Sequence, residues 1–300
     1  MVSLSERGES IVLWLREAPS LLTVGAFFVA WVILWLPLAI PGAIALKWRP
    51  PQPPTNAQKL PLLACLYAIA PFLVWGMTRL TNIDPRSYGL VWRPQLIVSL
   101  LYGLILGLLG LLLLFGLQTF WGWVEWQRPA ETADAALPVR EPGTDTQSPP
   151  PVGTIVLSIF VLGLWIGGTE ELIFRGFLLT ELQQDYGATL AAIVSSAIFA
   201  LLHLVWEWRE TLPQLPGLWL MGMVLVLARW ADAGNLGLAW GLHAGWVLGI
   251  AAIDSMQLIH YTGRCPDWVT GLGGKPLAGM MGSALLLATG ALLCYVTQMA

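Results

Sequence analysis

Apolar runs of about twenty residues recur along the whole sequence, and they constrain the fold more than any other feature. A helix of that length spans the hydrocarbon core of a bilayer. Because the runs are continuous and do not alternate with period two, they predict helices and not the strands of a membrane barrel. Hydrophobic residues make up 56% of the chain and charged residues 11%, and the mean hydropathy is +0.69, which is typical of a membrane protein.

The predicted fold is an all-α, polytopic bundle of about eight transmembrane helices. The runs lie at residues 20–46, 60–78, 96–122, 153–178, 188–206, 217–230, 237–258 and 277–298. We expect Pro37 or Pro41 to kink the first helix or end it early, and the sixth run is short for a full crossing. Residues 1–19 predict a helix lying in the membrane interface, with no signal-peptide cleavage site.

A polar segment divides the chain into three predicted parts. Residues 125–152 combine Pro, Thr, Ala and acids with few large apolar side chains, which indicates a linker. Residues 1–124 hold the interfacial helix and three membrane helices, and residues 153–300 form a peptidase-like membrane core with about five. The first two loops are both basic and lie on opposite sides of the membrane, so the positive-inside rule assigns no orientation.

The stretch "GGTEELIFRGFLL" places three charged side chains inside an apolar run. Each costs about 2.5 to 3.5 kcal/mol at mid-bilayer unless it faces protein or water. On a helix, Glu171 and Arg175 share a face and can form a salt bridge, whereas Glu170 points about 100° away. A carboxylate without that partner suits general base chemistry. The alternative interpretation is that the three residues mark a helix end at the interface.

Two of the three histidines, His203 and His243, also lie in apolar runs. Polar groups on three helices indicate a shared cavity, because unpaired groups in lipid are costly. Glu170 could then activate water, with His203 orienting the water and His243 facing the oxyanion of a peptide bond under attack. The same three groups could instead hold Zn²⁺ with an open position. No HExxH, GxSxG or GxGD motif is present.

The segments "EELIFRG", "FALLH" and "GLHAGWV" resemble the signatures of the CAAX protease and bacteriocin-processing family of intramembrane peptidases, also called CPBP or Abi, which includes the Ras-converting CAAX endoprotease. That family is marked by EExxxR, FxxxH and HxxxN or HxxxD on successive helices. The first signature matches at Glu170, Glu171 and Arg175, and the second at Phe199 and His203. The resemblance covers roughly residues 155–250.

The resemblance implies an endopeptidase in which Glu170 and His203 activate water, Glu171 and Arg175 support them, and His243 faces the oxyanion. Phe199, the aromatic residue of the second signature, is expected to bind substrate. No cofactor is favoured, and Zn²⁺ is the alternative. The expected partners are the lipid bilayer and a hydrophobic or membrane-anchored peptide, in a prokaryotic inner membrane. The net charge of -3, without a basic patch, gives no support to nucleic-acid binding.

The third signature departs from the family, because Val247 stands where Asn or Asp is usual. Asp254 is about 16 Å further along a helix, too far to replace that group, and Asn235 precedes the helix. This departure keeps open a non-catalytic scaffold or immunity-type binding protein of the same family. A proton-coupled transporter is a third candidate, although the hydropathy pattern has no internal repeat.

Overall fold

The computed structural model describes residues 17–49, 52, 54–127 and 152–299. Nearly all of the interfacial helix expected at 1–19 and of the linker expected at 125–152 lies outside these residues. The long helices are α2 (Ser20–Ala45), α3 (Asn56–Thr81), α4 (Pro94–Phe120), α5 (Val152–Glu170), α7 (Ala188–Leu202), α9 (Leu215–Ala231), α10 (Gly237–Met256) and α12 (Met280–Met299).

Shorter elements connect these helices. A π-helix, η2 (Glu171–Leu178), follows α5 directly and leads into α6 (Leu179–Asp185). The others are α8 (Leu204–Thr211), α11 (Asp267–Thr270), the 3₁₀ turns η1 (Pro85–Tyr88), η3 (Leu212–Gln214), η4 (Leu272–Gly274) and η5 (Pro276–Ala278), and the strands β1 (Val124–Trp126) and β2 (Ile259–Tyr261).

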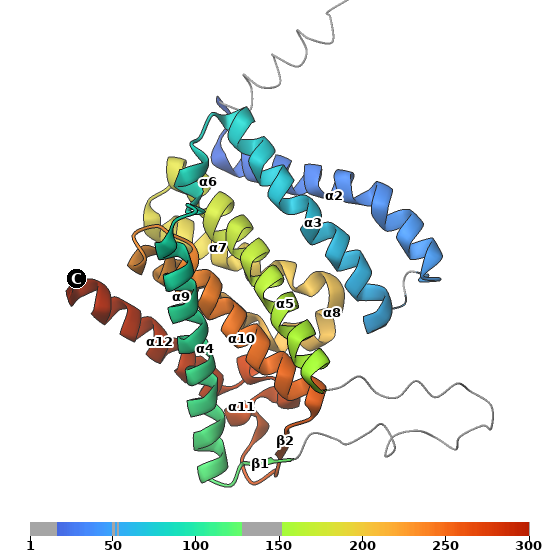
Figure 1. Cartoon of the computed structure of the whole chain (residues 1–300), viewed down its shortest axis with the longest axis vertical. Coiled ribbons are helices and arrows are strands. Elements are labelled where there is room, and N and C mark those ends of the chain that lie inside the picture. The colour runs from blue at the N-terminus through green and yellow to red at the C-terminus, as the bar shows by residue number, and fades with distance from the viewer. Residues whose placement is uncertain (1–16, 50–51, 53, 128–151, 300) are drawn as a thin grey trace, which may run out of the picture.

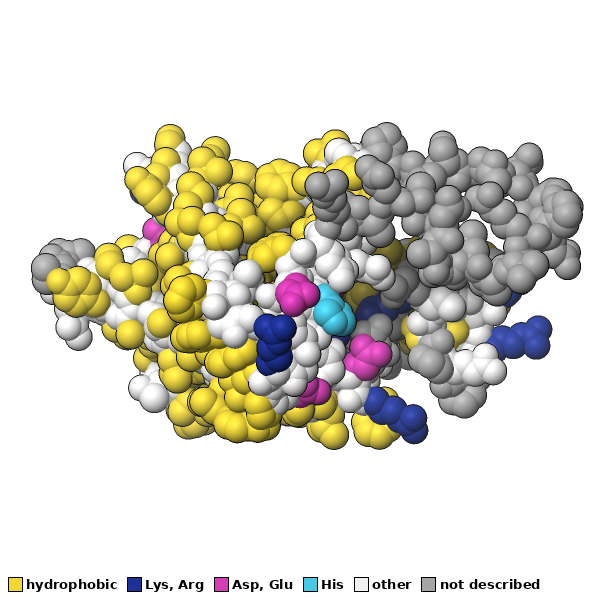
Figure 2. All heavy atoms as spheres, turned by 90° about the horizontal axis from the view of Figure 1, so that it is seen from below, with side chains coloured by type: hydrophobic (Ala, Val, Ile, Leu, Met, Phe, Trp, Pro, Cys, Tyr) yellow, Lys and Arg dark blue, Asp and Glu magenta, His cyan; other side chains and the backbone are white. Residues whose placement is uncertain are grey.

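Seven helices of the described part are long and apolar enough to cross a membrane, and α7, with 15 residues, is a shorter apolar helix. The all-α, polytopic fold is therefore confirmed, and the protein is a multi-pass integral membrane protein. Figure 2 shows hydrophobic side chains over the flanks of the molecule, with charged side chains gathered near the middle of the face in view. Such an apolar flank suits contact with lipid.

Helix α2 runs through Pro37 and Pro41 to Ala45, which agrees with the first predicted run and shows no early end. Other predicted boundaries are wrong. The fourth run continues past residue 178 to Asp185, and the sixth begins earlier, within a span from residue 208 to 231. The helix predicted over 188–206 stops at Leu202, because the His203 amide bonds to the Ala200 carbonyl three residues back and tightens the chain into a turn.

Helices α4 and α10 lie side by side (Figure 1) and share the most extensive contact between elements of the described part. Their contact is lined by Gly103, Gly107, Gly237, Gly241 and Gly245. A side chain at Gly241 would collide with the Leu100 carbonyl oxygen, so only glycine permits this approach of the two backbones. The N-terminal helices therefore pack directly on the core that carries His243.

Two short strands were not predicted from the sequence. Strand β1 pairs antiparallel with β2, so that Val124 lies opposite Tyr261 and Glu125 opposite His260. Glu125 and Trp126, expected to begin the linker, thus belong to a strand that pairs with the strand of His260. With three residues each, these strands are too short to produce an alternating pattern that sequence reasoning could detect. The pair ties the end of α4 to the end of α10 (Figure 1).

Candidate active site

The two glutamates lie where α5 passes into the π-helix η2. Glu170 is the last residue of α5 and Glu171 the first of η2, and both side chains are buried. Within η2 the turn is wider than in an α-helix: the Leu179 amide bonds to the Phe174 carbonyl, five residues back. The sequence predicts a regular α-helix here. Insertions of this kind occur frequently at functional sites.

Glu171 forms the predicted salt bridge with Arg175. Arg175 Nη1 lies 2.9 Å from Glu171 Oε1, and both side chains are essentially inaccessible to solvent. The other arm of the guanidinium donates to the Gly222 carbonyl at 3.3 Å. Its carbon lies 4.3 Å from the centre of the Phe199 ring, within cation–π distance. Arg175 is therefore fixed on several sides, and it fixes Glu171 in turn.

His243 of α10 reaches both glutamates. Its Nδ1 is 2.8 Å from Glu171 Oε1, and its Nε2 is 3.6 Å from Glu170 Oε2. An ionised carboxylate only accepts hydrogen bonds, so beside an ionised Glu171 the Nδ1–H of His243 is the donor of this hydrogen bond. The contact between Nε2 and Glu170 is attractive only when one of the two groups also carries a proton. The arrangement therefore provides a shared acid–base proton in a buried setting.

Tyr67 of α3 completes this cluster, and sequence analysis missed it. Its hydroxyl donates a hydrogen bond to Glu170 Oε1. The second oxygens of Glu170 and Glu171 are buried and accept no hydrogen bond from the residues described. The available signal was a tyrosine in the middle of an apolar run, "ACLYAIAP", where a phenol needs a partner. It was hidden because nothing in the sequence pairs α3 with α5.

His203 contacts the Phe199 ring, which also lies near His243. The centres of the Phe199 and His203 rings are 4.6 Å apart, and those of Phe199 and His243 are 6.0 Å apart. His203 Nδ1 is 2.8 Å from the Phe199 carbonyl oxygen, which accepts, so Nδ1 donates and Nε2 is left with a lone pair in the neutral ring. No hydrogen bond or ion pair joins His203 to either glutamate within the described ranges.

The structure does not group the three ligands that the zinc alternative requires. Across the residues that the structure describes, no three His, Cys, Asp or Glu side chains are grouped so that they could hold a metal ion. Glu170 and His243 approach each other, but His203 does not join them. A zinc site with protein ligands needs at least three of them around one point.

Val247 lies one turn beyond His243 and lines a pocket of about 510 Å³ between α3, α5 and α10. Its lining is Lys59, Leu60, Thr154, Ile155, Ser158, Ile159, Leu162, Gly163, Val247, Ala251 and Ser255. The polar members, apart from Ser158, come from the starts of α3 and α5 and the end of α10, so the pocket has a polar end and an apolar end. The apolar end, at Gly163 and Val247, is the end nearer to Glu170 and His243.

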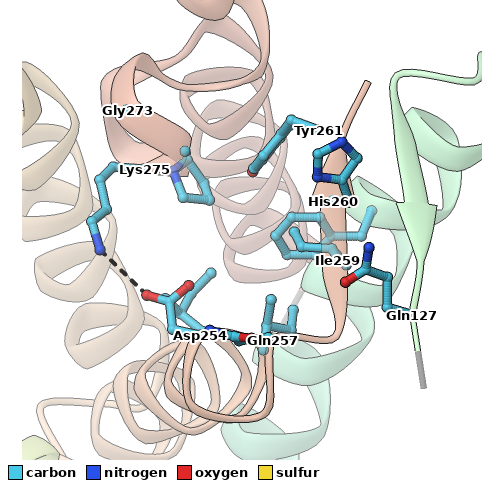
Figure 3. Close-up of a pocket in the computed structure, with 13 residues that line it drawn as sticks. Gln127, Asp254, Gln257, Ile259, His260, Tyr261, Gly273 and Lys275 are labelled. Carbon is cyan, nitrogen blue, oxygen red and sulfur yellow. Dashed lines mark hydrogen bonds and ion pairs between the residues drawn. The ribbon is translucent and has the colours of Figure 1, made fainter. Parts of the chain in front are cut away.

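Neither candidate replacement for the missing polar group lies at the site. Asn235 Oδ1 accepts from the Gly237 amide at 2.9 Å, which stabilises the start of α10. Asp254 faces a different pocket of about 380 Å³ and lies 3.4 Å from Lys275 Nζ (Figure 3). The expectation that Asp254 is too far from His243 is confirmed.

Residues 152–249 match the family model described as type II CAAX prenyl endopeptidase Rce1-like. The match begins with α5 and ends seven residues before the end of α10, so it includes every charged residue of the cluster and both histidines. No curated protein and no solved structure gives a significant match to the chain.

Proposed function

We propose that this chain, which belongs through its Rce1-like domain to the CAAX protease and bacteriocin-processing (CPBP, Abi) family of membrane peptidases, is an intramembrane endopeptidase that uses a glutamate to activate water. The observation that carries the proposal is the placement of His243 between Glu170 and Glu171 in a buried cluster. Burial of charges at such a cost is expected where they serve a reaction.

In the proposed reaction Glu170 is the general base. Its free Oε2 takes a proton from water as the water oxygen attacks the carbonyl carbon of the peptide bond. His203 Nε2, with its lone pair, is suited to accept the second hydrogen bond of that water. The protonated Glu170 then gives its proton to the leaving nitrogen as the C–N bond breaks, which yields a carboxyl and an amine product.

His243 supplies the donor for the oxyanion in this proposal. With Nδ1 bonded to Glu171, a protonated ring presents its Nε2–H toward the space beside Glu170. Two carboxylates and the two cations Arg175 and His243 then balance in charge. Because the donor is the imidazolium itself, the step does not need the polar residue that Val247 replaces. Val247 is therefore compatible with activity.

The substrate that fits best is a hydrophobic or membrane-anchored peptide. The pocket lined by Val247 runs along α5 and α10, and its apolar end lies about 6 Å along the helix from His243. We expect an apolar segment of the substrate to occupy it. Val247→Trp should fill the pocket and raise KM, whereas Val247→Asn should leave cleavage within about threefold, since the proposed donor is His243. The host bilayer we expect, on the resemblance alone, is a prokaryotic inner membrane.

The direct test is cleavage of a membrane-peptide library by the purified protein in detergent. Glu170→Gln and His243→Gln should each reduce the rate by about 100-fold or more, the usual contribution of general acid–base catalysis. His260→Gln is the matched control, because His260 lies in β2, away from the glutamates, and should leave the rate unchanged. Wild-type cleavage that resists a chelator would support the glutamate mechanism.

Other outcomes would favour a different mechanism or function. Loss of cleavage on chelation would make the protein a metallopeptidase and would refute the proposed role of Glu170 as an unaided base. Absence of cleavage by the folded wild-type protein would refute the enzyme assignment and favour a binding or scaffold role. Proton-coupled uptake into liposomes that depended on Glu170 would favour the transporter.

A further inference from the structure

A second buried arginine, Arg229, contacts the π-helix η2 and belongs to none of the sequence signatures. It is in the last turn of α9, and only 6% of its surface is exposed. Its Nε donates to the Gly234 carbonyl at 3.2 Å, and Nη2 donates to the Ser87 carbonyl at 2.6 Å. Both terminal nitrogens also bond to the Thr180 hydroxyl, at 3.2 and 3.1 Å. All these acceptors are neutral.

The remaining hydrogen bond of Arg229 reaches the candidate active site. Its Nη1 donates to the backbone carbonyl of Arg175. In an α-helix the Leu179 amide would bond to that carbonyl, but here the Leu179 amide bonds to Phe174 instead. The wide turn of η2 thus deprives the Arg175 carbonyl of its usual donor, and Arg229 provides one from another helix. A buried carbonyl without a donor would cost about 1 to 3 kcal/mol.

Arg229 also brings charge without a direct counterion. Among the described residues it forms no ion pair, and the acidic group whose charge acts on it is Glu171. Arg229 is thus a second buried guanidinium, besides Arg175, whose charge is felt by the cluster.

We propose that Arg229 is a positioning residue for the site: it stabilises the π-helical turn that carries Glu171 and Arg175. The catalytic part of this inference rests on the proposed peptidase function, whereas the structural part does not. If η2 relaxed to an α-helix, the residues after the wide turn would rotate relative to Glu170, and Arg175 could not keep its contacts with both Glu171 and Gly222.

The test compares Arg229→Gln, which removes the charge, with Arg229→Lys, which keeps it but lacks the planar fork. Arg209→Gln is the matched control, because Arg209 is an exposed arginine over the Trp208 ring. The first measurement is hydrogen–deuterium exchange of the amides from 171 to 180 in detergent. We expect both Arg229 variants to exchange faster there, with the control unchanged. This readout needs no cleavage activity, so it separates the inference from the proposed function.

The second measurement uses cleavage kinetics. We expect Arg229→Gln to lower kcat by about 10- to 100-fold with a smaller change in KM. Arg229→Lys should recover part of kcat, because its ammonium group can still donate a hydrogen bond to the Arg175 carbonyl. Unchanged exchange in Arg229→Gln would overturn the positioning of η2. A kcat of Arg229→Gln equal to that of the wild type would overturn its effect on the site.

Discussion

Removal of the Arg175 guanidinium should lower the stability of the fold, because Glu171 is buried beside it. In Arg175→Met the Glu171 carboxylate stays inaccessible but loses the charged partner that lies 2.9 Å away. Breaking a buried ion pair on one side costs about 3 to 5 kcal/mol, because one charge is left uncompensated. The loss of the bond to Gly222 and of the contact with Phe199 acts in the same direction. An apparent Tm lower by about 6 to 20 °C follows from the usual scaling.

The assay is thermal unfolding of the purified protein in detergent, as a double-mutant cycle. Glu171→Gln together with Arg175→Met should recover a large part of the loss, since a neutral amide needs no counterion. Arg79→Met is the control, because Arg79 is exposed and lies 5.2 Å from the centre of the Trp75 ring, a contact worth at most about 1 kcal/mol. The reasoning is refuted if Arg175→Met and Arg79→Met lower Tm equally, or if the double variant is no more stable than Arg175→Met.

Three further predictions concern other parts of the molecule. Gly241→Ala should lower Tm strongly because its methyl group meets the backbone of α4, whereas Gly25→Ala, with open space around it, should not; equal shifts would contradict the packing. Tyr67→Phe should slow cleavage by about tenfold or more by removing a bond to Glu170, with the exposed Tyr102→Phe as control. Burial raises the pKa of the Asp232 carboxyl, so its contribution to stability is lost as pH rises through that pKa, and Asp232→Asn should flatten the fall in Tm above about pH 4.

The helices of this fold could be predicted because a bilayer demands long apolar runs, and the runs are explicit in the sequence. Their ends could not be predicted as well. α2 continues through two prolines, and α7 ends at a single turn made by His203. The contact between α4 and α10 could not be predicted, because glycines indicate a close approach of two backbones but not which helix is the partner.

The contacts of the site also differ in whether the sequence predicts them. The bond between Glu171 and Arg175 is local, so helical spacing predicts it. The contacts of Tyr67 and Arg229 are long-range, and each depends on a helix that no local pattern connects to η2. The π-helix itself has no sequence rule, since the same residues also satisfy an α-helix. Its presence moves the Leu179 amide from the Arg175 carbonyl to the Phe174 carbonyl, and Arg229 donates to the Arg175 carbonyl.

The departure at Val247 has a different meaning once the contacts of His243 are known. A neutral imidazole that donates through Nδ1 to Glu171 would have only a lone pair at Nε2, and a neighbouring Asn or Asp would be needed to supply the oxyanion donor. In the proposed reaction the ring lies protonated between two carboxylates, and its Nε2–H is then itself the donor. A polar residue at position 247 is then not needed as a donor, and Val247 lines the apolar pocket. Replacement of His243 should therefore be far more damaging than any change at Val247 that keeps the pocket open.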